Sequence, residues 1–501
     1  MEKSTSTNTS PIPSDMMTWV AMGIALCIGY LIKQLVEMLT SPLYEIPGPP
    51  TWSPFGQVST IMKEPPGDSY IKWSEQYGGI LRYVFPIYHQ KVALINPDYI
   101  KHVLVTNCTK YKKPEEGKKF LLPAIGEGLV LLEGQKHAKA RKIINPAFKH
   151  SKIKELVPIF HRFAQALVEY WQSRIDNCGG QEAILEVHED LSRVTLDIIC
   201  KSAFDYECNA LEDPTNEASV AFAKVLGGLD FDWTFFIPFY NYLPTPGNLK
   251  TKRVLSLCHN TINRVIKERL EKETLDEEKC LLDILLSLRD EDNNTGFTET
   301  ELKDHIMTFM AAGHETTSVA IAWTLYALAG KPEIQNKARR EIYKALHQCD
   351  NITWDILDGL TYLDSVVKES LRLYSPVPVT FREALADDMI GDYFIPKGTA
   401  VTLLPPHRFS KYFQDPLKFD PDRWNTTAKD IKPYTFMPFL AGPRICIGAK
   451  FAITEIKCIL SLLLSNFSFR LVPDLEITRR LYLTMRPLPS LKLIVSPISS
   501  S

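Results

Sequence analysis

The hydrophobic pattern is most unusual near the N-terminus, where one stretch has the character of a membrane span. Residues 16–32 (MMTWVAMGIALCIGYLI) carry no charge and are followed by Lys33. This length is at the short limit for a helix that crosses a bilayer. A cleavable secretory signal has basic residues directly before a shorter apolar core, whereas Asp15 precedes this stretch. The pattern therefore favours an uncleaved single-pass anchor over residues 16–33, after an N-terminal tail of residues 1–15.

Prolines dominate the segment that follows the anchor. Ile46-Pro47-Gly48-Pro49-Pro50 cannot form the interior of a helix and favours stiff, extended backbone. We expect residues 34–54 to form a proline-rich hinge that holds a folded body away from a membrane, with an ordinary loop as the alternative. No internal repeat or second linker of this kind follows, so residues 55–501 are predicted to form one domain.

The pattern of this domain is mainly helical, with small pieces of sheet. Residues 80–85 and 91–96 alternate in the manner of two strands and predict a hairpin. Residues 389–404 predict a second hairpin, bent around Pro396-Lys397-Gly398. The expected fold class is therefore mainly α with small β-sheets.

The clearest predicted helix has a signal at each end. Thr298 and Glu301 form a capping box, and Gly330 with Pro332 closes the far end. The helix between them would be roughly 46 Å long, at 1.5 Å per residue, and must cross the whole body. Its middle contains Gly313, which costs about 1 kcal/mol relative to alanine. We therefore expect something other than helix stability to select the residues around it.

Composition and charge narrow the possible functions. The chain of 501 residues has 57 Lys and Arg against 59 Asp and Glu, which gives a net charge of −2 and excludes nucleic-acid binding through bulk electrostatics. Length alone would suit roughly three domains, but the pattern indicates one. Ten cysteines are too few for a disulfide scaffold, and no Cys-x-x-Cys pair or zinc spacing occurs.

One cysteine nevertheless stands in a loop suited to chemistry. Gly442 and Gly448 flank Cys446, which leaves the backbone free to turn and to aim N–H groups at the sulfur. The sequence becomes helix-periodic from Ala449, so Cys446 lies just before a helix N-terminus, where an anion is favoured. A single thiolate without a companion cysteine suits an axial haem ligand. A buried structural cysteine is the alternative, and we accept it for Cys458.

These residues carry a family resemblance. The pattern Phe439-x-x-Gly442-x-Arg444-x-Cys446-x-Gly448 resembles the haem-binding signature of the cytochromes P450. Three further motifs agree in order and spacing: Glu369-x-x-Arg372, Pro421-Asp-Arg423-Trp424, and Ala312-Gly313-His314-Glu315-Thr316-Thr317. The resemblance implies the fold of that family, with the long helix over the haem and residues 55–501 as a haem-thiolate catalytic domain. It also implies that Arg423 completes a buried triad with Glu369 and Arg372.

The resemblance implies a non-covalent haem b held by several residues. Cys446 would bind the iron, with Phe439 and Gly448 beside it. His137, Arg141, Arg382 and Arg444 are the candidates for pairing with the propionates. His137 stands where the family usually has tryptophan, and a surface histidine is the alternative. Some long-chain fatty-acid hydroxylases of the family carry a glutamate bound covalently to haem at the place of Ala312, which this chain lacks.

The same resemblance points to a proton-delivery pair on the long helix. A dioxygen adduct must gain two protons on its outer oxygen before that oxygen can leave as water. Glu315 would relay the protons, and Thr316 would donate a hydrogen bond to bound oxygen. Ala312 and Gly313 would leave room beside the iron. A threonine that merely donates to its own helix is the alternative for Thr316, and it is compatible with this role.

Electrons must come from outside the chain, because it contains no dinucleotide-binding, flavin-binding or iron–sulfur pattern. The resemblance implies a membrane-bound NADPH-dependent diflavin reductase, with cytochrome b5 as a further donor, and an endoplasmic-reticulum membrane with the catalytic domain in the cytosol. Seven cations without an acid could dock such a partner: Lys136, Lys139, Arg141, Lys142, Lys149, Lys152 and Lys154. A solvated helix face is the alternative.

The substrate is predicted only as a class. Family position suggests that the pocket is lined by Phe120 to Ile125, Phe309, Ala312, Val377 to Phe381 (with Val379 and Phe381 foremost) and Tyr482 to Met485. These residues are mostly apolar, which favours a lipophilic substrate, although each could equally belong to the core. Two other functions stay open: a haem-thiolate isomerase or dehydratase that needs no external electrons, and a non-catalytic haem carrier or sensor. The Glu315–Thr316 pair argues against both and favours a monooxygenase.

Overall fold

The computed structural model describes most of the chain. The described residues are 14–51, 53–227, 240, 243–271, 280–287, 297–347, 351–426 and 430–498. The predicted N-terminal tail lies outside these residues except for its last two positions.

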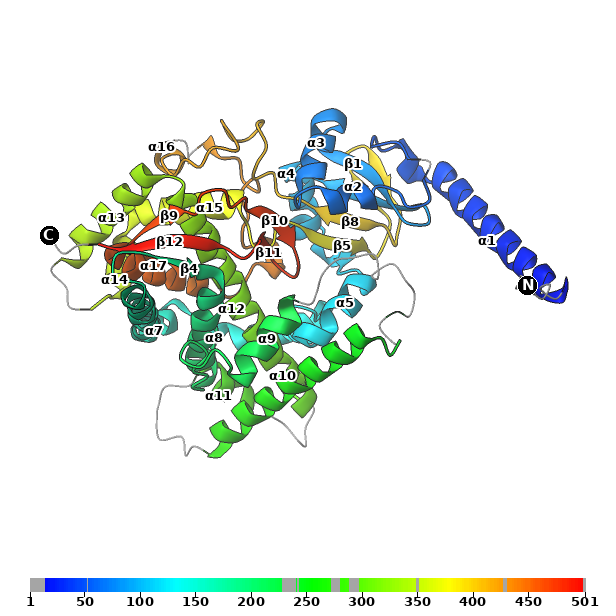
Figure 1. The fold of residues 1–501 in the computed structure, drawn as a ribbon. Coiled ribbons are helices and arrows are strands. Elements are labelled where there is room, and N and C mark those ends of the chain that lie inside the picture. Colours follow the sequence, from blue (N-terminus) through cyan, green and yellow to red (C-terminus); the bar gives the residue numbers. More distant parts are fainter. Residues whose placement is uncertain are drawn as a thin grey trace, which may run out of the picture.

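The predicted anchor is part of a longer helix, α1 (Ser14–Thr40), that extends away from the rest of the molecule (Figure 1). Its residues Thr18–Thr40 are long and apolar enough to cross a membrane, and none of the residues in the apolar window is buried. The helix continues into the predicted hinge, because residues 34–38 are good helix formers. It ends where Ser41 caps the short turn η1 (Pro42–Glu45).

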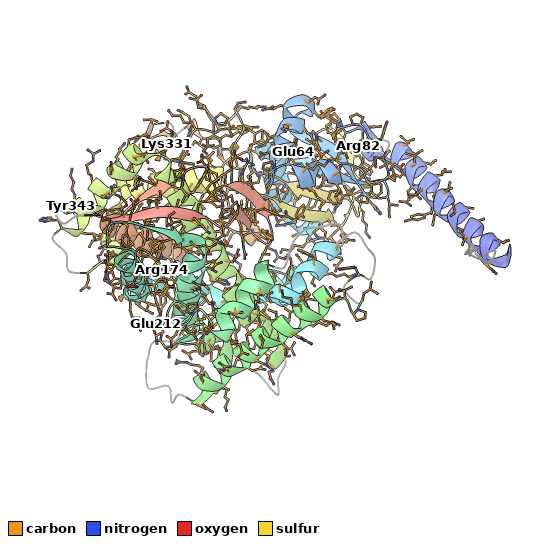
Figure 2. The ribbon with its side chains drawn as sticks, in the orientation of Figure 1. Glu64, Arg82, Arg174, Glu212, Lys331 and Tyr343 are labelled. Atoms are coloured by element: carbon orange, nitrogen blue, oxygen red, sulfur yellow. The ribbon has the colours of Figure 1, made fainter. Side chains whose placement is uncertain are left out.

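The proline segment after η1 packs on the body and is not a free spacer. Ile46 is buried, and the Arg82 N–H donates to the carbonyl of Pro47 at 2.9 Å. A side chain at Gly48 would collide with the Arg82 carbonyl, so this glycine permits the close approach. The Arg82 guanidinium, labelled in Figure 2, lies 4.6 Å from the ring centre of Tyr44. The chain is therefore tied to the first strand directly after the apolar helix.

A five-stranded sheet beside α1 forms one side of the body (Figure 1). Its strand order is β1-β2-β8-β5-β3. The first predicted hairpin is confirmed, because β1 (Ile80–Phe85) pairs antiparallel with β2 (His89–Leu94). Apolar residues on both faces of these strands are buried, which matches a sheet covered on both sides.

The second predicted hairpin is wrong. The hairpin here joins β6 (Asp388–Ile390) to β7 (Tyr393–Ile395) and turns at Gly391, which has a φ of 60°. Pro396 to Gly398 instead leads into β8 (Ala400–Leu403), which pairs parallel with β2 and antiparallel with β5 (Thr380–Ala384). The turn lies at Gly391 because glycine readily adopts the left-handed conformation. The proline segment is a connection between two sheets.

The long central helix is confirmed as α12 (Glu299–Ala329), and the Thr298–Glu301 capping box forms at its start. It packs along α8 (Val187–Phe204). A Cβ added to Gly313 would lie 2.7 Å from the Ile199 side chain of α8. Close packing of the two helices therefore accounts for this glycine. From the sequence we expect Gly313 to provide room beside an iron. The structure instead explains this glycine by its contact with Ile199.

The other described elements complete the body. Its further helices are α2 (Val58–Lys63), α3 (Asp68–Tyr77), α4 (Pro97–Lys101), α5 (Glu115–Ile125), α6 (Gly134–Ile144), α7 (His150–Asn177), α9 (Glu217–Gly227), α10 (Pro246–Glu271), α11 (Leu281–Leu286), α13 (Pro332–Leu346), α14 (Trp354–Gly359), α15 (Thr361–Leu373), α16 (Arg423–Thr426) and α17 (Ala449–Asn466). Short helical turns are η2 (His102–Thr106), η3 (Cys108–Lys110), η4 (Asn145–Phe148) and η8 (Gly442–Arg444). The further strands are β3 (Tyr111–Lys112), β4 (Ala183–Glu186), β9 (Phe467–Leu471), β10 (Thr478–Leu481), β11 (Met485–Leu488) and β12 (Lys492–Pro497).

Candidate functional site

The Cys446 loop is held in one conformation by its backbone. The Cys446 N–H donates to the Phe439 carbonyl at 2.9 Å, and the Ile445 N–H donates to the Gly442 carbonyl at 3.0 Å. Gly442 has a φ of 70°, and a side chain there would collide with the Leu104 carbonyl of η2. Only glycine fits this position without strain, so the loop is pinned against η2.

The environment of the Cys446 thiol combines burial with groups that favour an anion. Surrounding protein raises the pKa of the thiol, while the Gly448 N–H and the nearby Arg141 guanidinium lower it. One side of Cys446 keeps accessible surface. The sulfur therefore has donors that would stabilise a thiolate once a metal ion replaces its proton.

Phe148 connects the cysteine loop to the central helix. Its ring stacks on Phe309 of α12 with 5.5 Å between ring centres. A Cβ at Gly448 would lie 3.9 Å from the same ring and 4.0 Å from the Cys446 sulfur. The buried Phe309 side chain thus packs in the core next to the loop, although the sequence placed it in the substrate pocket.

Basic side chains from four segments meet beside the cysteine loop. Arg141 of α6 donates to the Ile445 carbonyl at 2.6 Å, and Arg444 bonds to Glu133. Lys113 lies 3.5 Å from the same Glu133 carboxylate. Buried Arg382 of β5 donates to the Phe381 carbonyl at 2.7 Å. Arg444 and Lys113 thus share the Glu133 carboxylate, which also attracts Arg382, while Arg141 binds the loop backbone.

His137 of α6 faces this basic cluster and not the solvent. Its side chain is buried, so the alternative of a surface histidine is wrong. Burial, with repulsion from Arg444, Lys113 and Arg141, lowers the pKa of His137 to about 4. The imidazole is therefore neutral at physiological pH and can donate one hydrogen bond.

The basic cluster has more cations than the Glu133 carboxylate can balance. Burial and the neighbouring Arg444 and Arg382 lower the pKa of Lys113 to about 7, and burial with Arg444 lowers the pKa of Arg382 to about 10. The buried Nη1 atom of Arg444 has no hydrogen-bond partner. Buried cations need paired anions, and two carboxylates next to a cysteine loop would supply them. These residues therefore fit a haem, whose propionates would lie in the cluster while Cys446 faces the iron.

The residues of the predicted triad lie together in the core. Arg372 donates to Glu369 through Nε at 2.9 Å and Nη2 at 2.8 Å, and Arg423 Nε donates to the same carboxylate at 2.9 Å. The Trp424 indole N–H adds a bond of 3.0 Å. Each oxygen of the Glu369 carboxylate thereby accepts two of these hydrogen bonds. A buried charge requires such complete pairing.

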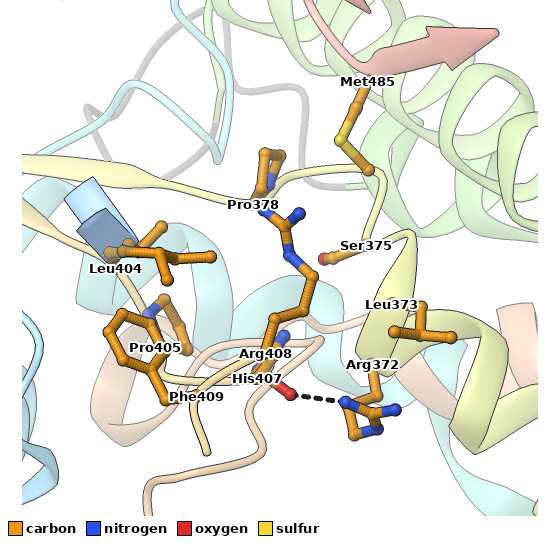
Figure 3. A pocket seen from close by; sticks show the side chains of 11 residues that line it. Arg372, Leu373, Ser375, Pro378, Leu404, Pro405, His407, Arg408, Phe409 and Met485 are labelled. Atoms are coloured by element: carbon orange, nitrogen blue, oxygen red, sulfur yellow. Dashed lines mark hydrogen bonds between the residues drawn. The ribbon is translucent and has the colours of Figure 1, made fainter. Parts of the chain in front are cut away.

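A small pocket borders this triad (Figure 3). Arg372 lies in its wall and donates to the His407 carbonyl at 2.8 Å. Pro378 and Met485 line it as well, so two ranges predicted to line the substrate pocket meet here. The Met485 N–H donates to the carbonyl of Pro376, the residue directly before the other range, at 2.8 Å.

Glu315 forms a buried ion pair that the sequence did not indicate. Arg486 Nε and Thr484 Oγ1 both donate to its Oε1 atom at 2.6 Å. Burial raises the pKa of Glu315, but the attraction of Arg486, with that of His188 and His314, outweighs it and holds the pKa below its usual value. Glu315 is therefore an ionised carboxylate in the interior.

Thr316 and Ala312 share one face of α12, one turn apart. The Thr316 hydroxyl donates to the Ala312 carbonyl at 2.8 Å, and the Thr317 hydroxyl donates to the Gly313 carbonyl at 3.0 Å. The back-bonding geometry is thus present at Thr316, and its oxygen can still accept a hydrogen bond. Ala312 and Thr316 keep accessible surface, whereas Ala311, Glu315 and Thr317 beside them are buried.

The other predicted pocket residues do not gather at one described cavity. Phe120 of α5 and Val379 are partly buried, and Phe381 of β5 is exposed. Ala124 and Ile125 at the end of α5 are buried, and the Thr308 hydroxyl of α12 donates to the Ile125 carbonyl at 2.6 Å. The α5 segment is thus fastened to the central helix.

The predicted basic surface separates into two groups. Lys136, Lys139 and Lys142 recur every three residues on α6 and are exposed, opposite its buried face, and Lys149 is also exposed. Lys152 pairs with Glu155, and Lys154 lies 3.3 Å from Asp355. Arg141 points to the cysteine loop and does not belong to the surface.

Several site residues were missed by the sequence analysis. Lys113, Glu133, Phe148 and Arg486 reach the site from loops, a short turn or a strand outside the motifs. Thr484 lies within the predicted pocket range, but the sequence did not indicate its bond to Glu315. Lys113 and Arg486 carried a weak signal, as basic residues beside predicted pocket segments.

Comparisons with known proteins agree on one family. The sequence model of the family described as cytochrome P450 matches residues 46–495. The chain is 30% identical to cytochrome P450 4B1 of Rattus norvegicus over 98% of both chains, and 29% identical to cytochrome P450 monooxygenase 205 of Postia placenta over 93% of both. A crystal structure of a cytochrome P450 (CYP102L1) has a TM-score of 0.78 at 23% identity and covers 90% of this chain and 99% of that one. The fold class expected from the sequence is confirmed.

Proposed function

The chain belongs to the cytochrome P450 family of monooxygenases, and we propose that it inserts one oxygen atom from O2 into a lipophilic organic substrate, by hydroxylation or epoxidation. The observation that carries this proposal is the meeting of the Cys446 loop with a basic cluster in which a buried Arg444 nitrogen has no partner. NADPH would supply the electrons through a partner reductase.

Different residues of the site would bind different parts of haem b. Cys446 would be the axial ligand, with Phe439 and Gly448 fixing its loop, while Arg141, Arg382, Arg444, Lys113 and neutral His137 would hold the propionates. Ala312 offers no carboxylate for a covalent link, so the haem would be held without one. When bound, the haem supplies the iron that activates dioxygen, and thiolate ligation favours cleavage of the O–O bond.

The chain's own contribution to the reaction is proton delivery and exclusion of water. Glu315 would take up a proton at its carboxylate and pass it on, and the Thr316 oxygen would orient the group that receives it. The Glu369 cluster with Arg372 and Arg423 would be structural, because its carboxylate is completely occupied and buried. The apolar residues near α5, α12 and β5, foremost Phe120, Ala312, Val379 and Phe381, would select a lipophilic substrate.

Electron delivery would use the exposed face of α6. Lys136, Lys139 and Lys142 on this face, with Lys149 at the start of α7, form a positive surface in a chain of near-neutral charge, which suits an acidic partner. We assign it to an NADPH-dependent diflavin reductase, with cytochrome b5 as a second donor. The α1 helix would anchor the chain in the endoplasmic-reticulum membrane, where it could meet both the reductase and a lipophilic substrate.

The proposal is tested by reconstitution. The full chain, loaded with haem and placed in lipid vesicles with a diflavin reductase, is screened for lipophilic ligands that change the iron spin state. Each ligand found is then incubated with and without NADPH and O2. A monooxygenase forms an oxygenated product only when both are present. Product formation without NADPH would instead identify a haem-thiolate isomerase or dehydratase, and the absence of any product from all ligands would favour a haem carrier or sensor.

A further inference from the structure

The Glu315 carboxylate is bound on one side only. Its Oε1 atom accepts both the Arg486 Nε–H and the Thr484 hydroxyl, each at 2.6 Å. None of the described groups donates to Oε2. The side chain is 1% exposed, so this arrangement is set by protein groups and not by solvent. Oε1 is thus held in place, and Oε2 is left to exchange protons.

The two donors stand on a rigid support. They flank Met485 in the β10–β11 hairpin, whose turn is closed by the Tyr482 N–H donating to the Thr484 carbonyl at 3.0 Å. The Met485 carbonyl accepts the Trp323 indole N–H of α12 at 2.7 Å. The Met485 N–H is bound to Pro376, as described above. The hairpin is therefore fastened to the same helix that carries Glu315.

Within the described part of the chain, Arg486 is the permanent charge that acts most strongly on Glu315. The other titratable groups around it are His188 of α8 and His314 of α12, and Glu186 in turn faces His188. Burial lowers the pKa of His188 to about 4 and lowers the pKa of His314 as well, so both are neutral at physiological pH. Without Arg486, burial would be opposed mainly by the Thr484 hydrogen bond and would favour the neutral form of the carboxylate.

We propose that Arg486 and Thr484 are positioning residues for proton delivery, which hold Glu315 ionised with Oε1 fixed and leave Oε2 to exchange protons. The proposal rests on the role of Glu315 given above. In one cycle Oε2 accepts a proton from hydronium that the solvent supplies, which leaves as water. Glu315 becomes a carboxylic acid, and the same proton then leaves toward the acceptor. Arg486 stabilises the carboxylate before and after, so the pair returns to its starting charge.

The ionisation of Glu315 is measured directly by infrared spectroscopy of the haem-loaded full chain. The carbonyl stretch of a protonated carboxyl is recorded at about pH 7 for the wild type, for Arg486→Gln, and for each of these combined with Glu315→Gln. We expect a band in Arg486→Gln that disappears when Glu315→Gln is added, and no Glu315-dependent band in the wild type. The double variants are needed because burial also raises the pKa of Glu455, which gives its own band.

The functional measurement is the pH profile of NADPH-driven hydrogen peroxide release with the diflavin reductase and no added organic substrate. Because Glu315 would protonate at higher pH, Arg486→Gln is expected to move the midpoint of the acid limb upward by about one pH unit or more. Thr484→Val is expected to move it in the same direction by less, and Arg486→Lys to restore most of the wild-type profile.

Arg480 provides a matched control. It pairs with Arg486 across the hairpin and lies at a similar distance from the Tyr482 ring, but it is exposed. Arg480→Gln should change neither the band nor the profile. An unchanged band and midpoint in Arg486→Gln, or equal shifts in Arg480→Gln, would overturn the proposal. If Arg486→Gln does not fold, the shift in Thr484→Val decides. Failure of the proposed function would appear elsewhere, as loss of NADPH-dependent product formation by the wild type.

Discussion

At the scale of single residues, the buried charge of Glu369 requires several hydrogen-bond donors. Two arginines, an indole N–H and the Asp420 N–H all converge on it in the core. Removing one member of a buried ion network leaves the others without compensation, which costs more than the network contributes as a whole. Such a residue serves the fold and needs no contact with a substrate.

We expect Glu369→Gln to lower the free energy of unfolding by about 3–5 kcal/mol, because it keeps the side-chain volume but leaves Arg372 and Arg423 buried without a counter-charge. Denaturant unfolding of the haem-loaded protein measures this. The control is Asp364→Asn, which removes a partly exposed pair with Lys368 and should cost less than about 1 kcal/mol. Equal losses in both variants would contradict the structural role of Glu369.

At the scale of elements, the packing of α12 against α8 sets where the reactive part of α12 lies. The Thr195 hydroxyl of α8 donates to the His314 carbonyl at 3.0 Å, and Ile199 occupies the space beside Gly313. The local pattern showed that Gly313 is unfavourable for a helix but could not show what it faces. Its neighbour lies more than a hundred residues away, on a helix whose register only the folded structure defines.

Gly313→Ala is therefore expected to destabilise the protein by about 1–3 kcal/mol, although alanine is the better helix former. Gly117→Ala in α5 is the comparison, because a Cβ there meets nothing within 4 Å, and it should be neutral or slightly stabilising. Thermal unfolding of both variants checks the difference. A stabilised Gly313→Ala variant would show that α8 does not press on this position.

The sequence could predict those elements whose signals lie close together in the chain. Capping residues and alternation lie close together in the chain, and they located α12 and the β1–β2 hairpin. Pro396 to Gly398 looked like a turn because both residue types favour turns, yet the β6–β7 turn lies at Gly391 and the proline segment joins two sheets. Competition between two turn signals is settled by strand pairing, which a local pattern does not contain.

At the scale of the whole molecule, charge is distributed unevenly although the net charge is −2. Cations buried beside Cys446 face the interior, while lysines on the opposite face of α6 point outward. One short helix thus carries both a face toward the cysteine loop and an exposed basic face. The sequence analysis found this run of cations and placed Arg141 both in it and among the propionate candidates, because spacing alone did not separate the two faces.

Electron transfer from the diflavin reductase is expected to slow with rising salt, because docking depends on exposed charges. Lys139→Glu with Lys142→Glu should slow it several-fold at low ionic strength and flatten the salt dependence. Lys331→Glu, which makes the same substitution at a single site between α12 and α13, should have little effect. Stopped-flow reduction of the haem-loaded protein measures the rates, and salt-independent transfer by the wild type would contradict this docking face.

The most direct test of the account is the identity of the axial ligand. The carbon monoxide complex of the reduced, haem-loaded protein is compared in the wild type, Cys446→Ala and Cys458→Ala. A thiolate ligand gives a characteristic spectrum, which we expect in the wild type and in Cys458→Ala, whose cysteine is buried in α17. We expect that spectrum to be absent from Cys446→Ala. Its persistence in Cys446→Ala would contradict the assignment on which the proposed function rests.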